Sequence, residues 1–179
     1  RAALSSSSRT NTHQLAFSER TLFSEDHMTL PLEAVQAESL RCANCGCVAV
    51  NCSDVAIALV ALDAQVETTR RTLAAEDLFA ANESSTTVLM EGELIKEIWV
   101  PAPHPDRRQL YLKFRIRNAI DFPIVSVAFC ATMLAGRFHD ARVVLGAVSP
   151  VPLRAREVEK LLEDQSPSEE LAKEAARLA

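Results

Sequence analysis

The stretch YLKFRIRNAIDFPIVSVA, residues 111–128, decides the fold because its pattern changes at Asp121. From Gln109 to Arg117 apolar and polar side chains alternate, which is the two-residue period of a strand with one buried face. The alternation is expected to place the apolar residues on a core face: Leu110, Leu112, Phe114 and Ile116. The polar and cationic residues then lie on the opposite face: Tyr111, Lys113, Arg115 and Arg117. After Asp121 the chain is almost wholly apolar. We therefore predict two successive strands, the first carrying a row of cations.

Two interpretations of this cationic row stay open at this point. A solvated outer face is the more common role of such a row. The alternative is that the row lines a site for an anionic or polarised ligand, because Asp121 follows it and can pair with one of its arginines.

Further strands surround this stretch. The segment 93–101, ELIKEIWVP, alternates and ends at Pro101, and residues 101–108 form a proline-rich loop. Residues 137–152 read as another strand after an Ala135-Gly136 turn. Strands joined by such short links favour an antiparallel meander. Residues 65–73 are expected to form a hairpin, and residues 74–79 one helical turn.

Helices are predicted on both sides of the strands. Residues 53–62 have Ser53 as N-cap and an apolar surface on nearly every side, which indicates a buried helix. Residues 155–164 are amphipathic, and in residues 166–179 Ser166 and Glu169 have the spacing of a capping box. Strands followed by helices, without alternating βαβ units, predict an α+β fold.

Composition narrows the classes of function. The 179 residues carry a net charge of −5 and are 48% hydrophobic, which fits a globular protein. There is no basic stripe for nucleic acid, no apolar run long enough to cross a membrane, and no signal peptide. We expect a cytoplasmic protein that binds neither nucleic acid nor membrane, with about twelve disordered residues at its start.

Four of the five cysteines lie close together as C-x2-C-x-C-x4-C: Cys42, Cys45, Cys47 and Cys52. Thiolates at this spacing are candidate ligands of zinc or of an iron–sulfur cluster. The spacing differs from the four-cysteine ferredoxin run and from paired CxxC knuckles, so reduced thiols are the alternative. Cys130 stands in an apolar strand and is expected to be a small buried hydrophobic residue.

Three strings together carry a family resemblance: TTVLMEGELIKEIWVPAP, YLKFRIRNAIDFPIVSVA and ARVVLGAVSPVPLRAREVEKLLE. With the preceding CVAVNCSDVAIALVALDAQVETTRRTLAAEDLF they resemble, over residues 47–163, the flavin subunit of the molybdenum hydroxylases. That family includes xanthine dehydrogenase and the medium subunit of carbon monoxide dehydrogenase. The resemblance implies three parts: an unrecognised segment 1–41, the end of a second FAD-binding subdomain at 42–101, and a C-terminal α+β domain at 102–179, whose sheet of three or four strands packs on helices.

The resemblance also implies site residues for FAD. Asp54 matches an acid that hydrogen-bonds the ribityl or ribose part of FAD, and Ser53, in the same Ser-Asp pair at the start of the helix, is expected to be a cofactor-binding residue with it. Ile95 matches an apolar residue that packs on the flavin, and Lys113 matches a lysine near the isoalloxazine, where a cation raises the flavin potential. Arg117 is expected to shape the same end of the site. Without the resemblance, Asp54 reads as a helix N-terminal acid and Ile95 as a core residue.

In function, the resemblance implies an oxidoreductase component that is not active alone. Electrons would pass from a molybdopterin-binding large subunit through the [2Fe-2S] clusters of a small subunit to FAD, and then to NAD or another acceptor. The chain has four glycines and no glycine-rich pyrophosphate loop. Two alternatives therefore remain: a structural or interface module that does not bind FAD alone, and a cysteine-rich metal-binding module. An extra [4Fe-4S] site, found in hydroxybenzoyl-CoA-reducing relatives, makes an iron–sulfur cluster conceivable here.

Overall fold

The computed structural model describes residues 28–29, 50–81, 85–117 and 121–179. The predictions for the start of the chain, including Cys42, Cys45 and Cys47, lie outside these residues. The strands are β1 (Met28–Thr29), β2 (Gln65–Thr68), β3 (Thr72–Ala74), β4 (Ile95–Val100), β5 (Arg107–Phe114), β6 (Val125–Leu134), β7 (Arg137–Gly146) and β8 (Leu153–Arg154). The helices are α1 (Asp54–Ala61), the 3-10 helix η2 (Ala75–Leu78), α2 (Arg156–Leu162) and α3 (Glu169–Leu178).

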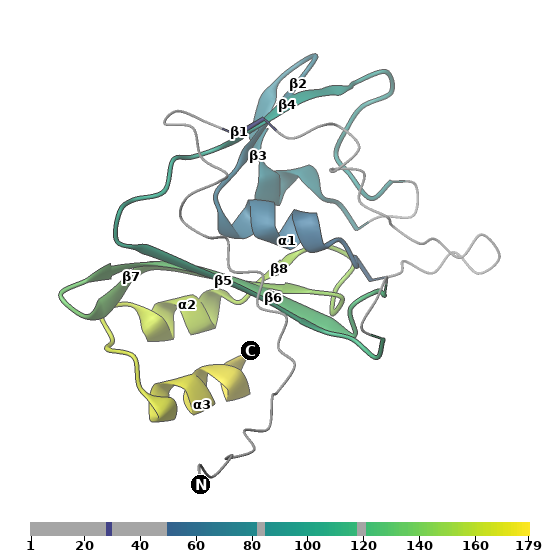
Figure 1. The fold of residues 1–179 in the computed structure, drawn as a ribbon. Coiled ribbons are helices and arrows are strands. Elements are labelled where there is room, and N and C mark those ends of the chain that lie inside the picture. The colour runs from purple at the N-terminus through teal and green to yellow at the C-terminus, as the bar shows by residue number, and fades with distance from the viewer. Residues whose placement is uncertain (1–27, 30–49, 82–84, 118–120) are drawn as a thin grey trace, which may run out of the picture.

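Two antiparallel sheets lie on opposite sides of α1 (Figure 1). The first has the strand order β1-β4-β2-β3 and the second the order β5-β6-β7-β8. Helices α2 and α3 lie on the face of the second sheet that is turned away from α1 (Figure 1). The α+β fold, the β2–β3 hairpin and the β5–β6–β7 meander are confirmed. Within the described residues, no helix is long and apolar enough to span a membrane.

Helix α1 forms the centre of the main core. Ser53 caps it, since its Oγ accepts a hydrogen bond of 3.2 Å from the Ala56 amide. The buried side chains of α1 pack between Val66 and Ile98 of the first sheet and Ala128 and Val144 of the second. An all-round apolar helix needs cover on both sides, and the two sheets supply it.

The prediction of which face of β5 is buried was wrong. Phe114 is 63% exposed and Ile116 83% exposed, and Leu110 and Leu112 are exposed as well. The cationic face is the one turned toward α1. The register explains the reversal, because Tyr111 lies opposite Ala128 and Lys113 opposite Ser126, which are both buried. Cross-strand partners share a face of the sheet.

The helices on the other face do not reach β5. Their core consists of Ala131, Ala141 and Val143 of β6 and β7 with Val158 and Leu162 of α2. Leu112 and Phe114 are therefore left uncovered among the described residues. Cys130 lies on the α1 face and is fully buried, as predicted. Burial raises the pKa of its thiol.

The last helix begins two residues later than predicted. Ser168, not Ser166, is its N-cap, and its Oγ accepts a hydrogen bond of 3.1 Å from the Leu171 amide. The reason is the segment before it. The backbones of Asp164 and Gln165 pair with Phe138 of β7, which keeps the chain out of the helix until Ser168.

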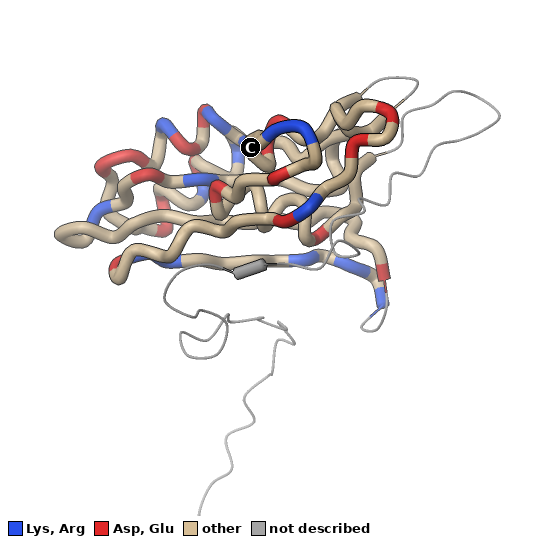
Figure 2. Tube along the Cα trace, turned by 90° about the horizontal axis from the view of Figure 1, so that it is seen from above, with Lys and Arg blue, Asp and Glu red and all other residues tan. Residues whose placement is uncertain are grey.

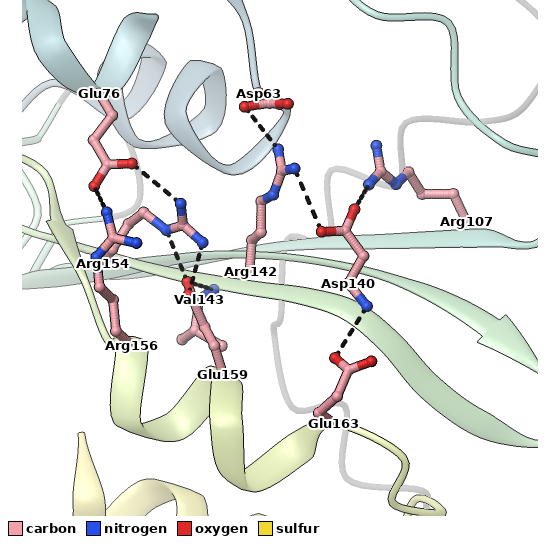
Figure 3. A network of polar contacts seen from close by, with 10 residues as sticks. All are labelled: Asp63, Glu76, Arg107, Asp140, Arg142, Val143, Arg154, Arg156, Glu159 and Glu163. Carbon is pink, nitrogen blue, oxygen red and sulfur yellow. Dashed lines mark hydrogen bonds and ion pairs between the residues drawn. The ribbon is translucent and has the colours of Figure 1, made fainter.

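Residues of both charge signs are interspersed along the described chain (Figure 2). Several of them join the α1 layer to the second sheet (Figure 3). Glu76 of η2 binds Arg154 at 3.1 Å and also pairs with Arg156. Asp63, just after α1, binds Arg142 of β7 at 3.1 Å. These pairs fix the placement of α1 and η2 on the second sheet.

One buried carboxylate holds the first sheet to the loop before β4. Glu93, whose side chain has no exposed surface, accepts hydrogen bonds from the Thr68 hydroxyl at 2.7 Å and the Met90 amide at 2.9 Å. Arg71 donates to it at 3.1 Å. The Met90 and Thr68 hydrogen bonds, followed by Arg71, lower the pKa of Glu93 from 4.5 to about 2.

Replacing Glu93 by Gln is therefore expected to change how stability depends on pH. A lowered carboxyl pKa stabilises the folded state above pH 4.5, and this contribution is lost as the pH falls from 4.5 to about 2. Glu93→Gln is expected to lower the free energy of unfolding at pH 7. The free energy of unfolding of this variant should also decrease less steeply than that of the wild type as the pH falls from 4.5 to about 2. Urea unfolding at a series of pH values measures both effects.

The matched control is Glu91→Gln, because Glu91 lies in the same turn with an exposed side chain. It should leave the pH profile of the free energy of unfolding unchanged. Equal slopes in the wild type and Glu93→Gln would contradict the role of the buried carboxylate.

Candidate functional site

An ion pair links the start of α1 to β5. The Lys113 Nζ lies 2.6 Å from the Asp54 Oδ2. Asp54 is held in the first turn of α1 by the Ser53 cap, and Lys113 is on the face of β5 that α1 covers. The Lys113 side chain is only 18% exposed, so for this residue the interpretation of the cationic row as a solvated outer face does not hold.

Polar atoms without partners gather around this pair. Three buried side-chain oxygens have no hydrogen bond within the described part of the chain: Asp54 Oδ1, Tyr111 Oη and Ser126 Oγ. Buried polar atoms are almost always satisfied in folded proteins, so such a group points to a polar partner such as a ligand or water. Asp54 uses Oδ2 for Lys113, while Oδ1 has no hydrogen bond of normal geometry and has the Tyr111 hydroxyl as its polar neighbour. Hydroxyl groups, such as those of a ribityl chain, are suitable donors to Oδ1.

The only tyrosine of the chain reports on this environment. Burial, and next the neighbouring Asp54 carboxylate, raise the pKa of Tyr111 above its usual value of 10. Negative charge and low polarity both disfavour a phenolate. The Tyr111 hydroxyl is therefore a neutral donor beside the carboxylate.

The space between α1 and the second sheet is small. A cavity of about 30 Å³ lies there, lined by residues that include Ala58, Tyr111 and Ala128. A volume of this size holds one or two water molecules.

The other predicted site residues lie apart from this pair. Ile95 begins β4 in the first sheet, on the opposite side of α1 from β5 (Figure 1). Arg117 lies beyond the end of β5 and pairs with Asp121, with an Nη2–Oδ1 distance of 3.2 Å. This confirms that Asp121 pairs with an arginine of the row. The Arg117 side chain is otherwise exposed.

The metal prediction for the cysteines stays a prediction. Cys52 is described and buried, while Cys42, Cys45 and Cys47 lie outside the described residues. Tyr111 and Ser126 are the polar residues that the sequence reasoning did not assign to the site. The two-residue period placed Tyr111 on the same face as Lys113, which was the available signal. Ser126 becomes a neighbour only through the β5–β6 register.

The site geometry makes the titration of Tyr111 testable. Asp54→Asn removes a negative charge beside the phenol, so the pKa of Tyr111 should fall toward its usual value. Part of the elevation should remain, because burial is its larger cause. Phenolate absorbance followed during an alkaline titration measures the change in a chain with a single tyrosine.

Glu170→Gln is the control, since Glu170 is an exposed acid of α3, a helix on the face of the second sheet that is turned away from α1. It should leave the phenolate titration as in the wild type. A Tyr111 titration that Asp54→Asn does not move would show that the carboxylate and the phenol do not interact.

Two family models match adjacent parts of the chain. Residues 40–103 match the FAD binding domain in molybdopterin dehydrogenase, and residues 109–179 match the CO dehydrogenase flavoprotein C-terminal domain. FAD is the cofactor of the first domain family, and the unpaired acceptor of Asp54 beside Lys113 is compatible with it.

Known proteins of the same kind are similar in sequence and structure. The glyceraldehyde dehydrogenase medium chain of Sulfolobus acidocaldarius is 30% identical over 128 residues, which are 69% of this chain and 44% of that protein. The reconstituted CO dehydrogenase from Oligotropha carboxidovorans superposes with a TM-score of 0.63 at 27% identity, covering 71% of this chain and 45% of its own. The carbon monoxide dehydrogenase from Hydrogenophaga pseudoflava gives a TM-score of 0.62 at 25% identity, covering 71% and 48%.

The chain spans less than half the length of each of these relatives. The matches nevertheless agree on one family, and the two domain matches follow each other in order along the chain. The chain belongs to the FAD-binding medium subunits of the molybdenum hydroxylases.

Proposed function

We propose that this chain is the part of a molybdenum hydroxylase flavin subunit that contacts FAD through Asp54 and Lys113. The observation that carries the proposal is the 2.6 Å ion pair between them, with the second Asp54 oxygen buried and without a hydrogen bond of normal geometry. When bound, FAD supplies two-electron redox chemistry to such a complex. The residues of this chain supply binding and electrostatics.

Asp54 has two separate tasks in this proposal. Its Oδ2 holds the Lys113 ammonium, and its Oδ1 accepts a hydrogen bond from a cofactor hydroxyl. Ser53 fixes the first turn of α1, so the direction of the carboxylate is set before the ligand arrives. Such preorganisation reduces the entropy lost on binding.

Lys113 contributes a positive charge of fixed position. Its side chain is only 18% exposed, and Asp54 at the start of α1 holds the ammonium. A cation next to the flavin favours electron uptake because it stabilises negative charge on the reduced ring. We assign Ile95 and Arg117 weaker roles, as an apolar contact and as a boundary of the site respectively.

The wider assembly follows from family membership and is part of the proposal. A molybdopterin-binding large subunit and a [2Fe-2S] small subunit would deliver electrons, and NAD or another acceptor would remove them. The chain would act in the cytoplasm as an oxidoreductase component that has no activity alone. The substrate of the complex is left open.

A second candidate function is an interface module that does not hold FAD alone. It is favoured by the sequence, in which the four glycines form no glycine-rich phosphate-binding pattern.

Adding FAD to the purified chain separates the two functions. We expect bound flavin to be visible by absorbance after gel filtration, and Asp54→Asn to weaken binding about tenfold, as expected for loss of one charge-assisted hydrogen bond of ~1.4 kcal/mol. Lys96→Ala is the control, because Lys96 pairs with Glu67 in the first sheet. A colourless wild-type chain that still captures molybdopterin and iron–sulfur subunits would favour the interface module.

The role of Lys113 is tested in the complete complex. Lys113→Ala is expected to lower the flavin reduction potential and to slow reduction of the acceptor, while oxidation at the molybdenum site continues. Spectroelectrochemistry measures the potential, and Lys96→Ala again serves as the control. An unchanged flavin potential would remove Lys113 from the electrostatics of the flavin.

A further inference from the structure

A second group of ligand-type side chains lies at the other end of the second sheet. His139 of β7 faces two carboxylates that follow α2, with its Nδ1 3.4 Å from Glu163 Oε1 and 3.3 Å from Asp164 Oδ1. The three ligand atoms lie within 4.8 Å of one another. Along β6, His139 lies opposite Thr132 and Lys113 opposite Ser126, so about 20 Å of strand separates this group from the flavin residues.

The spacing of these atoms suits a metal better than a hydrogen bond. Ligands at 2.0–2.1 Å from a tetrahedral zinc ion lie about 3.3–3.4 Å from each other. Both measured distances from the imidazole nitrogen of His139 fall in this range. Hydrogen bonds between nitrogen and a carboxylate are usually shorter, about 2.7–2.9 Å when charged.

The backbone holds the three residues in place. The Phe138 amide donates to the Gln165 carbonyl and the Asp164 amide donates to the Phe138 carbonyl, both at 2.9 Å. These bonds tie the segment carrying Glu163 and Asp164 to the strand carrying His139. The Asp140 amide also donates to Glu163 Oε2 at 3.1 Å (Figure 3), which leaves Oε1 as the oxygen near His139. Outer contacts of this kind orient ligands in metal sites.

The charges around the group are unbalanced. Among the described residues, no lysine or arginine forms an ion pair with Glu163 or Asp164. Arg137 donates to the backbone carbonyl of Asp164, and Arg107 and Arg142 are paired with Asp140. The C-terminus of α2 adds partial negative charge at the same place. The charges of two carboxylates beside a neutral imidazole ligand would balance that of one divalent cation.

We propose that His139, Glu163 and Asp164 bind a divalent first-row transition metal of the zinc class. One nitrogen and two carboxylate oxygens favour zinc over calcium or magnesium, which prefer all-oxygen sites. Three protein ligands leave one tetrahedral position for water. The metal would fasten the end of α2 to β7.

Metal titration of the full chain tests this proposal. Cys42, Cys45 and Cys47 are first replaced by Ser so that thiolates do not contribute, and the protein is freed of metal with a chelator. Calorimetry with Zn²⁺ is expected to give one ion per chain, and His139→Ala and Glu163→Gln are each expected to weaken binding at least tenfold. Zn²⁺ should also raise the unfolding temperature of the parent chain but not that of His139→Ala.

The matched control is His104→Ala, since His104 is an exposed histidine that lies 3.7 Å from one acid, Asp106. It should leave Zn²⁺ affinity unchanged, and circular dichroism should show that every variant is folded. Absence of stoichiometric Zn²⁺ binding, or an equal loss in His104→Ala and His139→Ala, would overturn the proposal and leave His139 as an ion-pair partner of the two carboxylates.

Discussion

The ion pair between Asp54 and Lys113 depends on the way α1 is buried. Because the helix is apolar on nearly every side, its buried side chains pack between two sheets. At its start, Ser53 and Asp54 supply the polar groups, and β5 brings Lys113 within 2.6 Å of Asp54. The buried part of α1 is apolar because it forms the core, so the charged pair of the helix lies at its start, where the core ends.

The sequence predicted the positions of the helices and strands better than it predicted which face of each strand is buried. A two-residue period shows that neighbours point to opposite sides of a sheet, but it does not show which side is covered. The small residues of β6 determine which face of β5 is covered. Ala128 and Ser126 are buried on the α1 side of β6, and their cross-strand partners Tyr111 and Lys113 therefore lie on the same side. The long stem of lysine can pack on apolar surface while its charged end reaches a polar group.

The candidate site could be predicted only in part for a similar reason. Asp54 and Lys113 were identified by resemblance, and the fold brings them together. Predicting the cluster of buried oxygens required knowledge of the β5–β6 register, which makes Ser126 the cross-strand partner of Lys113. No sequence pattern in the connection between the two strands predicts that register. Likewise, His139 and Glu163 stand in separate elements, and only the pairing of Phe138 with the segment after α2 makes them neighbours.

The two ends of α1 are both tied to the second sheet by charge. Asp54 binds Lys113 of β5 at the start, and Asp63 binds Arg142 of β7 just past the end. A helix held at both ends over a shared apolar core has little freedom to slide or rotate, so the direction of the Asp54 carboxylate is set by the whole layer. A cofactor that uses this carboxylate therefore meets an acceptor positioned by the fold, and changes far from the ligand, such as loss of Arg142, would act on binding through the placement of α1.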